Sequence, residues 1–119
     1  MSFAFENLDV YQRALKLNGS IEGLCRSLKG VVAYPYLDQL TRAVLSIPLN
    51  IAEGNGRWHV KEKRQFFWIA RGSTFEIVPI FQIFYQKGYI TQESYNSYYQ
   101  EAEVISKMLT ALIKAVEKI

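Results

Sequence analysis

Four stretches of the chain carry hydrophobic residues at alternating steps of three and four, and this spacing constrains the fold more than any other feature. An α-helix has 3.6 residues per turn, so such steps place side chains on one face of a helix. The sequence therefore predicts four amphipathic helices. Their expected core stripes are Val10, Ala14, Leu17, Ile21, Leu24 and Leu28; Leu37, Leu40, Val44, Ile47 and Ile51; Phe66, Ala70, Ser73, Ile77, Ile80 and Phe84; and Tyr95, Tyr98, Ala102, Ile105, Leu109, Leu112 and Val116.

Capping signals between the stripes predict where the helices begin and end. Glycine favours the position after a helix, and Gly30 and Gly88 follow the first and third stripes. Thr91 is a favourable N-cap for the last helix. Short connections favour antiparallel neighbours, so we expect an all-α fold, an up-down-up-down antiparallel four-helix bundle, in one domain over residues 1–119. The expected helices span residues 5–29, 35–56 and 60–87, followed by a fourth after Thr91.

The segment SIPLNIAEGNG, residues 46–56, concentrates unusual residues at the end of the second predicted helix. Pro48 lies inside the stripe and removes one backbone hydrogen bond. Because the hydrophobic period continues to Ile51, we expect a kink at Pro48 rather than a helix end. Pro79 is a second expected kink, and Gly54 and Gly56 are expected to end the second helix.

Composition excludes several classes of protein. Half of the residues are hydrophobic and 21% are charged, which is typical of a globular domain and not of a disordered one. The single cysteine, Cys25, cannot form an intramolecular disulfide and suits a reducing compartment. No stretch resembles a secretory signal or approaches the roughly 20 apolar residues that span a bilayer. We therefore expect a cytoplasmic protein without a membrane partner.

Four polar residues flank the core stripes of the second and third helices, and a buried carboxylate among them would need a partner. A di-iron bundle would need Glu-x-x-His motifs on two helices, whereas the only histidine, His59, stands at a helix start. We therefore expect no metal, and favour a hydrogen-bonded network that fixes the helix register and holds the bend. Its predicted members are Arg42, Asn50, Glu53 and Glu76.

Motifs for catalysis are absent from the sequence. We find no phosphate-binding glycine loop, no Ser/His/Asp order and no Cys/His spacing for a metal. The GNGR segment after the second helix is too short for a nucleotide fingerprint. The sequence therefore predicts a protein that is not an enzyme, with no catalytic residue and no cofactor.

Basic residues with interleaved tryptophans follow this segment at the start of the third helix. Lysine and arginine neutralise phosphates, and an exposed indole stacks on an unpaired base, so this stripe is a candidate nucleic-acid surface. A solvated basic face, or salt bridges to the acidic fourth helix of a neighbouring subunit, explains the same pattern, and the sequence leaves the choice open. The candidate nucleic-acid-binding residues are Arg57, Lys61, Arg64, Trp68 and Arg71, with Trp58 beside them.

A second apolar stripe on the third helix is distinct from its core stripe. A helix that is hydrophobic nearly all round must be covered on more than one side, and an isolated small domain should not expose such a patch. We therefore favour self-assembly over a small-molecule pocket. The predicted oligomer interface consists of Trp68, Gly72, Phe75 and Pro79.

Five motifs resemble the 23S rRNA intervening-sequence protein family, a family of bacterial four-helix-bundle proteins. They are FENLDVYQRA (residues 5–14), SIPLNIAEGNGR (46–57), Lys61-Glu62, ARGSTFE (70–76) and KGYIT (87–91). The resemblance implies a small bundle that assembles into a ring, a homopentamer, and it points to nucleic acid as a partner. Related bundles are accessory subunits that bind RNA and a reverse transcriptase.

These observations lead to one functional expectation and one alternative. We expect a non-enzymatic homo-oligomeric bundle that binds structured RNA or an RNA–protein complex through the basic start of the third helix. The alternative is an assembly or scaffold protein whose basic face contacts other proteins without binding nucleic acid.

Overall fold

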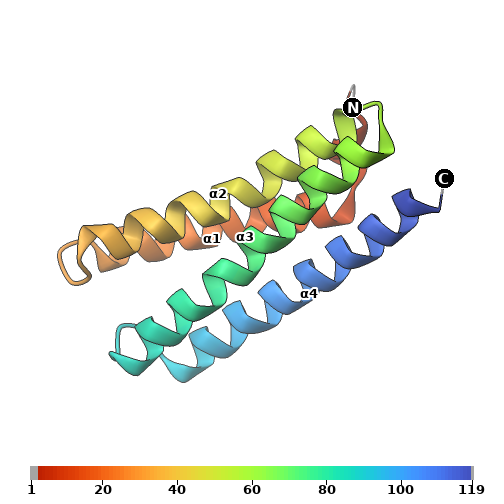
Figure 1. Ribbon diagram of the computed structural model, residues 1–119. Coiled ribbons are helices and arrows are strands. Elements are labelled where there is room, and N and C mark those ends of the chain that lie inside the picture. The colour runs from red at the N-terminus through yellow and green to blue at the C-terminus, as the bar shows by residue number, and fades with distance from the viewer. Residues whose placement is uncertain (1–2, 119) are drawn as a thin grey trace.

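The computed structural model describes residues 3–118 and confirms an all-α four-helix bundle (Figure 1). Successive helices run in opposite directions, so the two termini and the α2–α3 turn lie at one end of a bundle that measures 47 × 23 × 22 Å. Short connections join the helices, as expected. In the described residues the elements are a 3-10 helix η1 (Ala4–Asn7) and the α-helices α1 (Asp9–Leu28), α2 (Tyr34–Gly56), α3 (Val60–Gln86) and α4 (Gln92–Glu117).

The core stripes predicted for α1, α2 and α4 largely face the interior. All five predicted residues of α2 are buried, and so are five of the six on α1, with Leu24 half-buried. On α4 the middle of the stripe is buried, whereas Tyr95, Tyr98 and Leu112 are half-buried and Ile113 is buried in addition. The periodicity therefore predicted the inward faces of these three helices.

The core stripe predicted for α3 was wrong at three positions. The buried residues of α3 are Phe67, Ala70, Thr74, Ile77, Phe81 and Phe84, in place of a stripe that contained Phe66, Ser73 and Ile80. Because α3 packs between α2 and α4, its buried face points between these two neighbours. Ser73 instead faces α2, where its Oγ lies 2.8 Å from the Oγ of Ser46. Thr74 can be buried because its hydroxyl donates to the Ala70 carbonyl at 2.9 Å.

The first helix begins later than predicted. Residues 4–7 form η1, and Leu8 is extended, so α1 starts at Asp9 rather than at Phe5. Side-chain contacts hold this break: the Phe3 N–H donates to Glu6 Oε1 at 3.1 Å, and the amide of Gln12 donates to the Glu6 carbonyl at 2.9 Å.

The predicted continuation of α2 through Pro48 is confirmed, since the helix runs to Gly56. Helix α3 likewise continues through Pro79, and a bend at either proline stays a prediction. The Asn50 amide supports α2 around Pro48 because it donates to the carbonyl and the hydroxyl of Ser46, at 2.8 and 2.9 Å. The Ser46 hydroxyl also accepts a hydrogen bond from the Ser73 hydroxyl, so these contacts join α2 to α3.

Close packing and caps set the ends of the helices. A Cβ atom at Gly54 would lie 2.6 Å from Cε1 of the buried Phe67, so only glycine allows α2 and α3 to approach this closely. Gly30 and Gly88 have φ angles of 84° and 75°, a region that favours glycine. The predicted N-cap is confirmed, because the Ser94 N–H donates to Thr91 Oγ1 at 3.1 Å.

Candidate nucleic-acid and assembly surfaces

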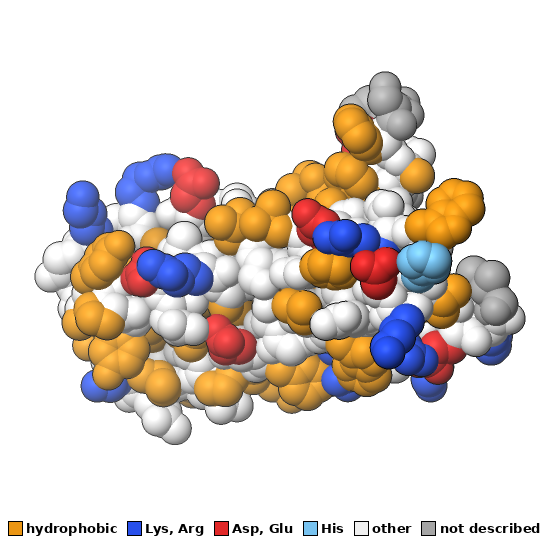
Figure 2. Space-filling view, turned by 45° about the horizontal axis from the view of Figure 1, so that its top comes forward, with side chains coloured by type: hydrophobic (Ala, Val, Ile, Leu, Met, Phe, Trp, Pro, Cys, Tyr) orange, Lys and Arg blue, Asp and Glu red, His pale blue; other side chains and the backbone are white. Residues whose placement is uncertain are grey.

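The predicted nucleic-acid residues lie along the start of α3, at the end of the bundle that carries the termini (Figure 1). Figure 2 shows this end, marked by the pale blue side chain of His59. Lys61, Arg64 and Trp68 line one open hollow of about 770 Å³ together with Glu117 of α4. The structure therefore brings three of the five predicted residues together on one surface.

Arg57 is held by its own surroundings at the α2–α3 turn. Its Nη2 lies 3.0 Å from Glu53 Oε2, and its guanidinium lies 4.7 Å from the centre of the Phe66 ring. The Arg57 Nε is buried and has no hydrogen-bond partner within the described part of the chain. Phe66, placed in the core by the sequence prediction, instead provides an aromatic face for this cation.

The other cations of this segment differ in how firmly they are bound. The Lys63 ammonium donates to the Asn55 carbonyl at 2.8 Å and so fastens the α2–α3 turn. Arg64 Nη1 and Glu117 Oε1 are 3.9 Å apart, and the two side chains keep 41% and 43% of their surface in water, so water weakens this contact. Lys61 is exposed and forms no ion pair with any residue in the range 3–118. Lys61 and Arg64 are therefore the cations most available to an external phosphate.

Arg71 is a clamp between helices rather than a free cation. Its guanidinium lies 5.1 Å from the centre of the Trp68 ring and 4.5 Å from that of Phe75. Its Nε donates to Thr110 Oγ1 on α4 at 2.9 Å. Each cation–π contact at such a site contributes about 0.5–1 kcal/mol. The predicted basic and apolar stripes share Trp68, and Arg71 joins them further because its guanidinium contacts both Trp68 and Phe75.

Trp58, which the sequence placed beside the five candidate residues but not among them, is the most exposed aromatic side chain of this surface. It lies in the α2–α3 turn, on no core stripe, and is 90% exposed. Its neighbours along the chain are Arg57 and the exposed His59. Its position outside every helical stripe, directly after the glycines of the turn, is the feature of the sequence that indicates an exposed side chain.

The predicted oligomer interface forms an exposed stripe on α3. Trp68 and Phe75 are 47% and 54% exposed, and Gly72 faces open space. Phe75 and Pro79 also line a hollow of about 430 Å³ between α3 and α4, which Tyr99 borders from α4. We call this hollow the α3–α4 groove. Its other lining residues are Thr74, Val78, Ala102, Glu103, Ser106 and Lys107.

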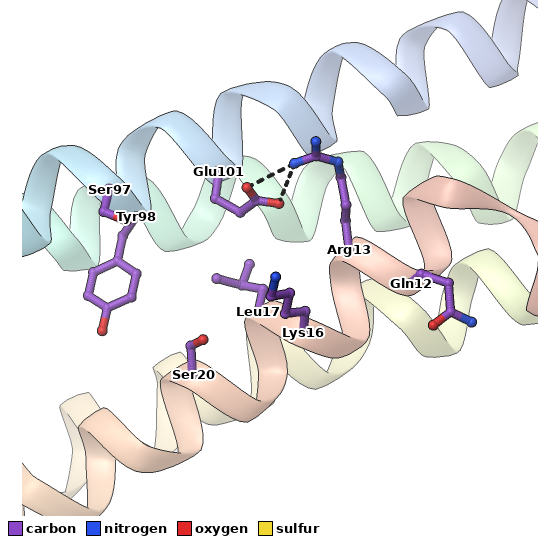
Figure 3. Close-up of a pocket in the computed structure, with 8 residues that line it drawn as sticks. All are labelled: Gln12, Arg13, Lys16, Leu17, Ser20, Ser97, Tyr98 and Glu101. Atoms are coloured by element: carbon purple, nitrogen blue, oxygen red, sulfur yellow. Dashed lines mark hydrogen bonds and ion pairs between the residues drawn. The ribbon is translucent and has the colours of Figure 1, made fainter.

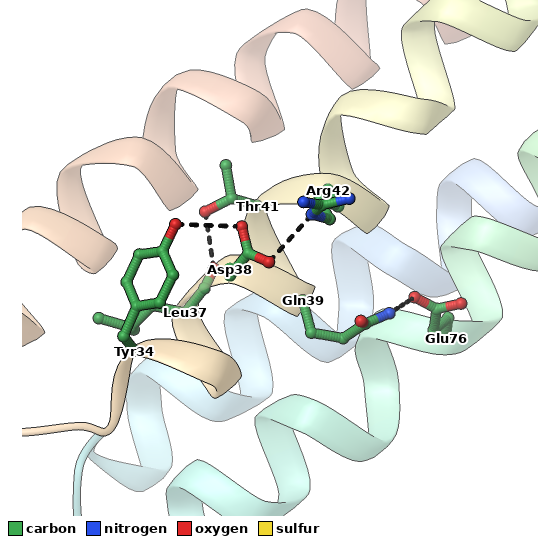
Figure 4. Close-up of polar contacts among 7 residues, drawn as sticks. All are labelled: Tyr34, Leu37, Asp38, Gln39, Thr41, Arg42 and Glu76. Carbon is green, nitrogen blue, oxygen red and sulfur yellow. Dashed lines mark hydrogen bonds and ion pairs between the residues drawn. The ribbon is translucent and has the colours of Figure 1, made fainter.

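The four residues predicted as one polar network have separate partners. Arg42 pairs with Asp38 one turn earlier on α2, at 2.9 Å, whereas Glu76 accepts a hydrogen bond from Gln39 at 2.6 Å (Figure 4). Glu53 pairs with Arg57, and Asn50 bonds within α2. Arg42, Glu53 and Glu76 are exposed, so each takes the nearest partner and none needs a buried network.

A polar hollow of about 450 Å³ opens between α1 and α4 (Figure 3). An ion pair closes one side, in which the Arg13 Nη1 group donates to both carboxylate oxygens of Glu101, at 3.0 and 3.1 Å. Tyr98 projects toward α1 from the other side, and burial, followed by the nearby charge of Cys25, raises the pKa of its phenol. Its lining residues come from α1 and α4, so this hollow is a polar seam between these two helices.

Residues 3–118 contain neither a membrane-spanning helix nor a metal-binding cluster. Within that range no helix is long and apolar enough to cross a bilayer. No group of three or more His, Cys, Asp or Glu side chains among the described residues could hold a metal ion.

The fold and these surfaces define an antiparallel helical-bundle protein whose exposed features are aromatic and basic. The chain belongs to the 23S rRNA-intervening sequence protein family, whose model matches residues 6–111. A similar fold occurs in the crystal structure of a protein with unknown function from the S23 ribosomal protein family of Bacteroides thetaiotaomicron VPI-5482, with a TM-score of 0.84. The two chains are 24% identical over 88% of this chain and 98% of the other. A comparison with curated proteins found no match.

Proposed function

We propose that the protein is a non-enzymatic, homo-oligomeric bundle of the cytoplasm that binds RNA or an RNA–protein complex through the α2–α3 turn and the start of α3. The observation that carries the proposal is the 90% exposure of Trp58 beside cations that the fold leaves available. Lys61 and Arg64 neutralise phosphates, while the Trp58 indole stacks on an unpaired base. The family's name, which refers to 23S rRNA intervening sequences, supports RNA as the partner.

A salt series tests RNA binding directly. Two phosphate contacts, from Lys61 and Arg64, predict that log affinity for a single strand falls with log salt at a slope of about −1.4. Lys61→Ala should reduce that slope by about 0.7, because it removes one contact. Trp58→Ala should weaken binding about 5- to 150-fold, the loss of one stacked base. Lys29→Ala, at the opposite end of the bundle, is the matched control and should leave the affinity unchanged.

The absence of RNA binding at low salt would refute this part of the proposal. A specific observation favours the alternative in that case: Arg57 and Arg64 already contact carboxylates, those of Glu53 and Glu117. The basic surface would then fit an acidic protein partner in a scaffold. A competition series with an acidic peptide and with RNA distinguishes the two partners, because only RNA binding depends on the exposed indole.

The exposed α3 stripe supports the proposed self-assembly. Trp68 and Phe75 keep about half of their surface in water, although aromatic side chains contribute most to core and interface energy. The family resemblance implies a homopentamer. Light scattering of the wild type and of Trp68→Glu tests this part, since a charge on the stripe should convert an oligomer to a 13.8-kDa monomer. A monomeric wild type would refute self-assembly and leave RNA binding to be judged by the salt series.

A further inference from the structure

A second apolar surface lies on α2. Leu45 and Leu49 occupy the same outer face one turn apart and are 46% and 55% exposed. Residues 43–52 contain no charge, which leaves about 15 Å of helix without a charged side chain. The exposed Phe3 borders Leu49 in a neighbouring hollow, and Figure 2 shows hydrophobic side chains along the upper edge of the molecule up to the N-terminal segment. We call Leu45, Leu49 and Phe3 the leucine ridge.

The leucine ridge and the α3–α4 groove lie on different sides of the bundle. Leu45 also lines a hollow with Asn18 and Cys25 of α1, so the ridge belongs to the α1–α2 side. The groove is bordered by α3 and α4. The two surfaces also have different shapes, because one is a ridge on a single helix and the other is a hollow between two helices. They can therefore be occupied at the same time.

We propose that the leucine ridge of one copy packs into the α3–α4 groove of a second copy, head to tail. The inference rests on the proposed self-assembly and names the surface that the groove receives. Two leucines one turn apart are the side chains that a helix inserts into an apolar groove. The groove offers matching apolar walls, Phe75, Pro79 and Tyr99.

Area and charge both favour a second copy as the occupant. Each surface keeps three exposed apolar side chains in water, and the contact would bury both sets together, as the apolar centre of a stable interface does. The charges are balanced as well. Arg42 and Glu53, which flank the ridge, already pair with Asp38 and Arg57. Glu103 and Lys107 at the groove have opposite charges, so neither surface carries an excess of one sign that would repel a second copy.

Head-to-tail packing has a consequence that two-fold packing lacks. Every contact uses one ridge and one groove, so an open chain of copies has a free ridge at one end and a free groove at the other. The chain either closes into a ring, which uses both, or continues to extend as a filament. A single defective surface therefore prevents all contacts between identical copies. Two copies with different defects still share one intact contact.

The test uses Leu49→Glu as the ridge variant and Phe75→Glu as the groove variant, with Val31→Glu as the control at an exposed apolar residue of the α1–α2 turn. Light scattering after size exclusion should give an oligomer for the wild type and the control and a 13.8-kDa monomer for each variant alone. An equimolar mixture of the two variants should form a 1:1 heterodimer and nothing larger. Far-UV circular dichroism and thermal melts confirm that each variant is folded.

Three results would overturn the inference. If Leu49→Glu assembles like the wild type while Phe75→Glu does not, the groove pairs with something other than the ridge. If both variants are monomeric and their mixture also stays monomeric, the contact is not head to tail. A monomeric wild type overturns the underlying self-assembly itself, and this outcome is distinguished from the other two before any variant is mixed.

Discussion

Gly54 provides the sharpest test of how α2 and α3 pack. A methyl group at this position would lie 2.6 and 2.8 Å from two atoms of the Phe67 ring and 3.1 Å from the Lys63 carbonyl oxygen. The ring cannot move aside easily because Phe67 is 1% exposed, and the carbonyl belongs to the backbone of α3. The helices must therefore separate, or the ring must leave its rotamer, if Gly54 is replaced by alanine.

The expected magnitude combines two opposing effects. Overpacking of a core costs about 1–3 kcal/mol, whereas alanine stabilises a helix interior by up to about 1 kcal/mol relative to glycine. Gly54→Ala should therefore lower the free energy of unfolding by roughly 1–2 kcal/mol. For a chain of this length each kcal/mol corresponds to about 4 °C in Tm. We expect Tm to fall by about 4–8 °C.

Gly56→Ala is the matched control, because a Cβ there meets no atom within 4 Å and its φ is not positive. It should be neutral or slightly stabilising. Urea and thermal unfolding followed at 222 nm measure both variants at one fixed protein concentration, since the stability of an oligomer depends on concentration. A double-mutant cycle with Phe67→Leu should show coupling of about 1 kcal/mol or more. Equal stability of the Gly54→Ala and Gly56→Ala proteins would refute the close-packing argument.

Three further predictions concern single side chains. Arg71→Met keeps the aliphatic stem but loses two cation–π contacts and a hydrogen bond to α4. Urea unfolding should therefore show a free energy of unfolding lower by about 1–2 kcal/mol, and an unchanged midpoint would contradict the role of Arg71 in joining α3 to α4. Thr91→Ala removes the acceptor for the Ser94 N–H and should cost about 1 kcal/mol, whereas Thr91→Ser should be neutral in the same melts. The raised pKa of the Tyr98 phenol means that its contribution to stability is complete below about pH 10, its ordinary pKa, and is lost as pH rises through the folded value. Wild-type stability should therefore fall more steeply above about pH 10 than that of Tyr98→Phe, and parallel curves would contradict this.

Local patterns were sufficient for the helices but not for the register of α3. Both Phe66 and Phe67 are hydrophobic, so a period of 3.6 fits either residue in the core. The position of α3 between α2 and α4 places Phe67 inside and leaves Phe66 beneath the Arg57 guanidinium. The N-terminal break likewise depended on contacts of Glu6 that periodicity does not encode.

The partners of charged side chains were the least predictable part of the candidate site. The sequence made Arg42 a candidate partner for an inward-facing carboxylate, whereas the structure pairs it with Asp38 on its own helix, 2.9 Å away. Arg71 has the right spacing for a phosphate-binding stripe, but the packing of α3 against α4 places it between two aromatic rings and beside Thr110. Long flexible side chains take whichever partner the neighbouring helix brings near, and sequence spacing does not specify that neighbour.

Local sequence patterns were sufficient to predict the number of helices, their limits to within a few residues, the inward faces of α1, α2 and α4, and the family. Each of these follows from local periodicity, caps and motifs, which act within one or two helical turns. The inward face of α3, the contact of Arg57 with Phe66 and the position of Arg71 between Trp68, Phe75 and Thr110 depended on the tertiary structure. These features depend on which helices lie next to each other, because burial and electrostatic contacts form between segments that are distant in the chain.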